Sequence, residues 1–173
     1  WVYDFDENTL LNKVEFLIKI YEKTRSSKST KANDLDYSIK WSSGLKANLH
    51  SNKKILFDRK KLRISSWRPF NRQYFYSEKM MNDRLTEFHY QMWGTNLDKE
   101  NQLINISGLS SMKPFQVLCS NSLSDYEFVE KNQCLPLYRY TENGERTDNI
   151  TDWGKEQFVN HYEDKKIKKE DIF

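Results

Sequence analysis

Glycine, cysteine and histidine are scarce in this chain of 173 residues, which has five Gly, two Cys and three His. It contains no Gly-rich loop for S-adenosylmethionine, no Asn-Pro-Pro-Tyr motif of adenine methyltransferases and no phosphate-binding loop of the GxxxxGK(S/T) type. The histidines lie far apart in the sequence, and the cysteines lack the paired Cys or His that zinc needs; they are His50, His89, His161, Cys119 and Cys134. We therefore expect no catalytic, cofactor-binding or metal-binding residues in this chain.

Long apolar runs are also missing. No stretch approaches the roughly 20 apolar residues that span a bilayer, and no secretory signal opens the chain. Two cysteines do not demand an oxidising compartment, which favours reduced thiols in a cytoplasmic protein without a membrane partner. The chain begins WVYDFDENTL, without Met, and ends EDIF, so we expect it to be a fragment of a longer protein.

Positive charge is concentrated between Lys53 and Arg72. This stretch has eight basic residues and one acidic residue (8 − 1 = +7), whereas the whole chain carries +3, which leaves −4 for the remainder. Aromatic side chains are interleaved with the charges. Basic groups neutralise phosphates and rings stack on bases, so the pattern favours a polyanionic partner. The alternative is a sheet with a basic solvent face and an aromatic core face.

Hydrophobic periodicity predicts an α+β fold, with a β-rich central sheet and amphipathic helices at the N- and C-terminal ends. The predicted helices cover Asn8–Lys23, Ser42–Leu49, Asp152–Tyr162 (capped by Thr151) and the segment from Lys168. The predicted strands cover Ile55–Phe57, Leu62–Ile64, Gln73–Tyr76, Leu103–Ile106, Phe115–Cys119 and Cys134–Tyr140, with a bend at Arg68 and Pro69. We divide the chain into an N-terminal helix with a mobile loop (1–34, the loop from Arg25 to Asp34) and a β-rich domain with a C-terminal helix (35–173).

Nine residues are candidates for DNA contact. Phosphate contact is predicted for Lys53, Lys54, Arg59, Lys60 and Arg72, and for Lys113 from a loop before Pro114. Asn71, Gln73 and Asn82 have side-chain amides that could read adenine edges in the major groove. Each of the nine could instead be an ordinary polar surface residue, and for Arg68 a structural role is favoured. We expect Trp67, Phe70 and Tyr74–Tyr76 to be mostly core, with only one or two of these rings free to face bases.

One pattern is typical of nucleases. Glu163 and Lys165 form an acid-x-lysine tripeptide downstream of Asp152, and metal-dependent nucleases place such groups around a divalent cation. The tripeptide follows a predicted helix in a segment of mixed charge, which favours a solvated helix end.

Five segments in order resemble the C-terminal specificity region of type ISP restriction–modification enzymes. They are IKWSSGLKANL (39–49), WRPFNRQYFY (67–76), ISGLSSMKPFQVL (106–118), CLPLYRY (134–140) and DNITDWGKEQFVNHY (148–162). The family usually has Tyr where Trp67 stands, a change that keeps the ring. The family's enzymes combine nuclease, helicase-like translocase, adenine methyltransferase and target-recognition parts in one chain. S-adenosylmethionine, ATP and Mg²⁺ are thus implied for the parent enzyme, and none of them for this fragment.

The resemblance implies a DNA target-recognition domain that binds duplex DNA and directs adenine methylation and restriction by other domains. Its implied partners are double-stranded DNA and the methyltransferase domain of the same parent chain. Two alternatives stay open: a protein–protein docking module whose basic face meets an acidic partner, and a small metal-dependent nuclease that uses Asp152, Glu163 and Lys165.

Overall fold

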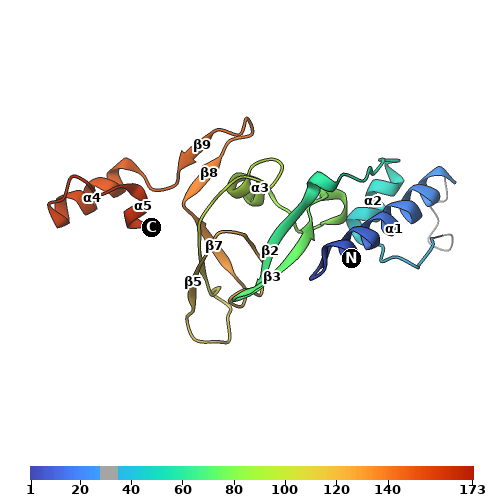
Figure 1. The fold of residues 1–173 in the computed structure, drawn as a ribbon, viewed down its shortest axis with the longest axis horizontal. Coiled ribbons are helices and arrows are strands. Elements are labelled where there is room, and N and C mark those ends of the chain that lie inside the picture. The colour runs from blue at the N-terminus through green and yellow to red at the C-terminus, as the bar shows by residue number, and fades with distance from the viewer. Residues whose placement is uncertain (28–34) are drawn as a thin grey trace. The chain divides into compact units, whose positions relative to one another are not determined.

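A computed structural model describes residues 1–27 and 35–173, which fold into a mixture of helices and short-stranded sheets (Figure 1). The helices are α1 (Glu7–Ser26), α2 (Ser43–His50), α3 (Glu87–Trp93), α4 (Asp152–Tyr162) and α5 (Lys169–Ile172), with the 3-10 turns η2 (Arg59–Lys61) and η3 (Lys79–Met81). The strands are β1 (Tyr3–Asp4), β2 (Leu62–Arg68), β3 (Asn71–Tyr76), β4 (Leu103–Ile106), β5 (Val117–Ser120), β6 (Leu123–Ser124), β7 (Gln133–Pro136), β8 (Tyr138–Tyr140) and β9 (Arg146–Asp148). The predicted α+β class, with helices at both ends, is confirmed.

The chain divides into two compact units. The first comprises residues 1–64 and 72–85, and the second comprises residues 65–71 and 86–173. The predicted boundary between residues 34 and 35 is a different division, since here the chain crosses into the second unit within β2, between residues 64 and 65, and returns between residues 71 and 72. Most of the predicted mobile loop lies outside the described residues, and its first two residues belong to α1.

In the first unit, α1 packs its apolar stripe into the core. Asp6 caps the helix, because its carboxylate accepts a hydrogen bond from the Thr9 backbone N–H at 2.7 Å. The core cluster consists of Leu10, Val14, Leu17, Ile18, Ile20, Tyr21, Leu35, Ile39, Trp41, Leu45, Leu49, Ile55 and Tyr76. Ser42 caps α2, and β1 pairs antiparallel with β3, with Tyr3 opposite Phe75. Residues as distant in sequence as α1 and β3 therefore share one core.

In the second unit, β4 lies between β5 and β7, antiparallel to both. Asn105 in β4 is fully buried, and its side-chain amide donates to the Leu118 carbonyl (3.1 Å) and the Ser120 hydroxyl (2.8 Å). These bonds satisfy a polar group that would otherwise be costly to bury. The residues Ser65 and Ser66 of β2 pair in parallel with Leu123 and Ser124 of β6. A separate two-stranded sheet contains β8 and β9.

Several predicted elements are confirmed, and others are corrected. The bounds of β4 match the prediction, as do those of α4 with Thr151 as its cap. The predicted strand Cys134–Tyr140 is two strands, β7 and β8, separated by Leu137, and Ile55–Phe57 does not join a sheet. Helix α3 was not predicted. Among the described residues, no helix is both long and apolar enough to cross a membrane.

Candidate nucleic-acid interface

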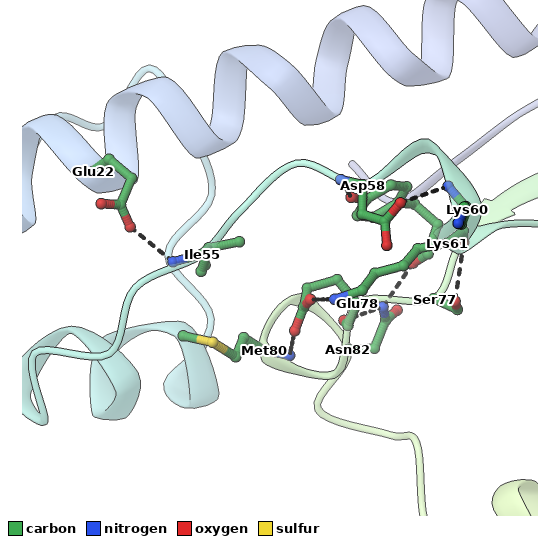
Figure 2. Close-up of polar contacts among 10 residues, drawn as sticks. Glu22, Ile55, Asp58, Lys60, Lys61, Ser77, Glu78, Met80 and Asn82 are labelled. Atoms are coloured by element: carbon green, nitrogen blue, oxygen red, sulfur yellow. Dashed lines mark hydrogen bonds and ion pairs between the residues drawn. The ribbon is translucent and has the colours of Figure 1, made fainter. Parts of the chain in front are cut away.

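The backbone that carries Lys53 and Lys54 is tied to α1. The Tyr21 hydroxyl donates to the Lys53 carbonyl at 2.7 Å. The Ile55 N–H donates to the Glu22 carboxylate at 2.8 Å (Figure 2). Burial raises the pKa of Tyr21 to about 12, so its hydroxyl keeps the proton that makes this bond. The side chains of Lys53 and Lys54 are exposed. Two lysines are thus displayed to solvent from a fixed backbone.

Turn η2 presents Arg59 and Lys60 next along the chain. Asp58 caps the turn by accepting from the Lys60 N–H at 2.9 Å, and the Asp58 N–H donates to the hydroxyl of buried Tyr76 at 2.9 Å. Lys60 is exposed, while the guanidinium of Arg59 pairs with Glu7 at 2.5 Å. A phosphate would have to compete with Glu7 for Arg59, but not for Lys60.

The neighbouring Lys61 is part of the fold. Its ammonium pairs with the carboxylate of buried Glu78, which also accepts from the Met80 N–H at 3.0 Å (Figure 2). Burial alone would lower the pKa of Lys61, but the pair with Glu78 outweighs it and the pKa lies above its ordinary value. The guanidinium of Arg63 likewise donates to the carbonyls of Lys60 and Leu62. Part of the basic stretch therefore stabilises the fold.

Two predicted base-reading residues have internal roles. The Asn82 amide donates to the carbonyls of Tyr76 (2.9 Å) and Glu78 (2.7 Å), where it closes the turn after β3. The side chain of Gln73 in β3 is only 8% exposed. The geometry favours structural roles for both, and their contact with DNA stays a prediction.

The β2–β3 tip projects its side chains into solvent. The guanidinium carbon of Arg68 lies 4.6 Å from the centroid of the Trp67 ring, and its Nη1 lies 3.8 Å from the Asp125 carboxylate, in keeping with the structural role favoured for Arg68. Asn71 and Arg72 are exposed. The prediction that Phe70 is core is wrong, because this ring is 98% exposed. Trp67 is half-buried, and only Tyr76 of the predicted aromatic core is fully buried.

Lys113 lies in an ordered loop of the second unit. The Glu130 carboxylate accepts hydrogen bonds from the Ser111 hydroxyl (2.6 Å) and the Lys113 N–H (3.1 Å). The bond from Ser111, followed by bonds from the loop backbone, lowers the pKa of Glu130 below its ordinary value. The side chain of Lys113 is exposed, and so is that of Met112 beside it. The carboxylate therefore fixes the backbone that carries Lys113.

The candidates are divided between the units. Those in the first unit are Lys53, Lys54, Arg59, Lys60, Arg72, Gln73 and Asn82, while Asn71 and Lys113 belong to the second. The first unit has 17 Lys and Arg against 10 Asp and Glu (17 − 10 = +7), and the second has 11 against 15 (11 − 15 = −4). The contrast in net charge between the Lys53–Arg72 stretch and the rest of the sequence is therefore also a contrast in net charge between the two folded units. That partition was not visible in the sequence, because the second unit begins inside the basic stretch.

The residues of the nuclease-like pattern, Asp152, Glu163 and Lys165, lie in α4 and in the segment between α4 and α5. The Asp152 carboxylate pairs with Lys169 at 2.7 Å, and this pair lowers the pKa of Asp152. Glu163 ends α4 in a left-handed conformation. Within residues 1–27 and 35–173, no group of three or more His, Cys, Asp or Glu side chains could hold a metal ion.

Comparison with known proteins identifies the family. The model of the type ISP C-terminal specificity domain matches residues 1–173, the whole chain. The chain belongs to this family. Solved structures agree: the "cryoEM structure DrdV-DNA complex" matches with a TM-score of 0.90 and 34% identity, over 100% of this chain and 17% of that one.

Two other solved structures, both of type ISP restriction–modification enzymes, are also similar to this chain. A nuclease-deletion mutant of LlaGI "in complex with a DNA substrate mimic" matches with a TM-score of 0.74 and 26% identity, over 94% of this chain and 16% of that one. LlaBIII "bound to DNA" matches with a TM-score of 0.80 and 19% identity, over 99% of this chain and 11% of that one, a likeness of fold. No curated protein matches the chain. The chain thus spans less than a fifth of the length of these structural relatives.

Proposed function

We propose that this specificity domain recognises the DNA target of a type ISP restriction–modification enzyme. The observation that carries the proposal is the exposed basic segment of the first unit, Lys53, Lys54, Arg59 and Lys60, on a backbone anchored by Tyr21, Glu22 and Asp58. Fixed positive charges are suited to a regular row of phosphates. Two structural relatives, DrdV and the type ISP enzyme LlaGI, are described as complexes with DNA or a DNA substrate mimic, which supports this partner.

Phosphate contacts position such a domain, and contacts to base edges give it specificity. We assign the positioning role to Lys53, Lys54, Lys60, Arg72 and Lys113, and to Arg59 when it leaves Glu7. Asn71 at the β2–β3 tip is the exposed candidate for reading a base, since Gln73 is buried and Asn82 is hydrogen-bonded within the fold.

In the parent enzyme, other domains would carry out the chemistry. We propose that they methylate an adenine flipped out of the duplex, and that they bind the S-adenosylmethionine, ATP and Mg²⁺ which that chemistry and restriction need. The specificity domain would act in the cytoplasm and hold the duplex in the register that presents the adenine.

A second candidate function is docking against the methyltransferase domain of the same parent chain. One face of the β5–β4–β7 sheet carries Val117 and Leu135, each about half exposed, beside the partly buried Ile104 and Ile106. An open apolar sheet face is suited to a protein surface. The relatives' chains are several times longer than this one, so a domain that could cover this face has room in such a parent. The two functions use different surfaces and are compatible.

Binding to duplex, single-stranded and mismatched DNA, measured by gel shift at two salt concentrations, tests the first proposal. We expect duplex DNA to bind, and binding to weaken steeply as salt rises, because each phosphate contact releases counterions. Absence of duplex binding at low salt, or binding that does not respond to salt, would reject DNA recognition through the basic segment.

A further inference from the structure

The tip joining β2 to β3 has an unusual residue for its backbone. Only Pro69 and Phe70 lie between the strands, and Phe70 has a φ of +64°. A two-residue turn with Pro first and a positive φ second has the character of a type II turn, whose second position favours Gly or Asn. A phenylalanine in the left-handed region is strained, since its Cβ crowds the backbone.

Packing does not compensate for this strain. The Phe70 ring is 98% exposed, so it gains almost no burial from its own fold. Glycine would relieve the strain and remove an apolar ring from water. Residues that break local rules without an internal benefit are expected at functional sites.

The chain around the tip is held firmly. The Asp125 N–H donates to the Ser66 carbonyl at 2.8 Å, and the hydroxyls of Ser66 and Ser122 share a hydrogen bond of 2.6 Å. Arg68 stacks on the Trp67 ring one residue before Pro69. The ring of Phe70 is therefore displayed from an ordered base within the second unit.

We propose that Phe70 inserts between adjacent bases of the bound duplex and unstacks them. The inference rests on the proposed DNA recognition and deepens it. Apolar wedges, including Phe, open base steps in this way, and every base offers a face on which a ring can stack. The chain neighbours of Phe70 favour DNA over a protein partner. The exposed Asn71 and Arg72 are able to donate hydrogen bonds to base edges or phosphates, whereas a protein-docking surface needs an apolar patch around the ring.

The test uses the full-length protein and duplexes with 2-aminopurine placed at successive positions of the target, since this base brightens when unstacked. For the wild type we expect several-fold brightening at one step. The variant Phe70→Gly should lose that brightening and bind about tenfold to hundredfold more weakly, in line with the loss of one stacking contact. Its salt dependence should be unchanged, because no charge is removed. Phe70→Trp should retain the brightening.

Phe88→Ala is the matched control, an exposed phenylalanine of the same unit with 71% exposure that should change neither signal. Phe70→Gly should melt at or above the wild-type temperature, which separates lost binding from lost folding. If the wild type binds duplex DNA without brightening at any step, or if Phe70→Gly retains both affinity and brightening, insertion is overturned while DNA recognition stands. If Phe70→Gly changes only the enzymatic activity, the ring docks against protein, and this result also overturns the insertion of Phe70 between bases. Absence of duplex binding by the wild type would reject the proposed function itself.

Discussion

The first unit is basic and is built around one apolar core cluster, whereas the second is acidic and carries the most exposed large apolar side chains, on its loops. The net charges are 17 − 10 = +7 and 11 − 15 = −4. The continuous cluster around α1 lies wholly in the first unit, while the most exposed large apolar side chains, Phe70, Leu109, Met112 and Phe115, all belong to the second. Under the proposed function, this difference would separate two kinds of DNA contact, one made by charge and the other by rings and amides.

Contacts made by charge should respond to salt, and contacts made by rings and amides should not. Substitutions of exposed lysines in the first unit should therefore change how affinity depends on salt. Substitutions of the uncharged Phe70 and Asn71 at the β2–β3 tip should change affinity by the same factor at every salt concentration. The comparison between the units thus becomes a pair of measurable signatures.

The largest expected effect comes from replacing a leucine by alanine in the core of the first unit, compared with the same replacement in a loop of the second. Leu10→Ala truncates a fully buried side chain of α1 and should lower the free energy of unfolding by roughly 2–5 kcal/mol. Leu109→Ala truncates a side chain that is 101% exposed and should stay within about 0.5 kcal/mol of the wild type. Urea titrations followed by circular dichroism measure both. A large loss for Leu109→Ala would mean that the loop is packed, and the contrast would fail.

Asn82→Ala separates structure from recognition in the first unit. It removes two hydrogen bonds that hold the chain after β3, and we expect a loss of about 1–3 kcal/mol because buried acceptors lose a partner. At a temperature where the variant is folded, its DNA affinity should equal that of the wild type. An unchanged melting temperature with weaker binding would instead make Asn82 a base-reading residue.

The smallest effect is a pH dependence in the second unit. The pKa of Glu130 is lowered in the folded state, so its bonds to Ser111 and Lys113 stabilise the fold fully at pH values above the pKa of this residue in the unfolded chain. This stabilisation is lost as the pH falls through the pKa of Glu130 in the folded state. The Lys113 amide resonance should shift in a titration whose midpoint lies below the ordinary glutamate value of 4.5. Glu130→Gln should abolish the transition. A midpoint at or above 4.5 would show that the carboxylate does not hold this loop.

The elements with strong local signals were predictable. Thr151 before an apolar period predicted α4, and the alternation Leu103–Ile106 predicted β4, because caps and periodicity are local properties of the chain. Helix α3 was missed since it has only seven residues, and only Trp93 is buried. The polypeptide crosses between units in the middle of the basic stretch, and that partition depends on tertiary contacts.

The candidate site was partly predictable for the same reason. The net positive charge of the Lys53–Arg72 stretch is a property of its composition, and lysines in such a stretch are expected to be exposed, as Lys53, Lys54 and Lys60 are. Which basic residues are paired depends on distant carboxylates, such as Glu7 for Arg59 and Glu78 for Lys61. Phe70 was misplaced because aromatic neighbours suggested a core. Pro69 was the available signal, since Pro is favoured at the first central position of a turn, which places the next residue in the turn and not in a strand.

The measurement that tests the account most directly is the salt dependence of duplex binding for two variants of equal charge change. One replaces Lys53, Lys54, Arg59 and Lys60 of the first unit with Ser, and the other replaces Lys155, Lys165, Lys166 and Lys168 of the second. If all four residues of the first set touched phosphates, the slope of log affinity against log salt would shrink by about 3.6. Arg59 is already paired with Glu7, so we expect three contacts at most and a fall between about 2 and about 2.7.

The matched set should change the slope by less than about 0.5, at roughly 0.9 per phosphate contact, with both variants shown to be folded by circular dichroism. Loss of affinity in the first variant should be similar for every DNA sequence, since phosphates carry no base identity. Equal slopes for the two variants, or an unchanged slope for the first, would contradict the claim that the basic segment of the first unit holds the DNA backbone.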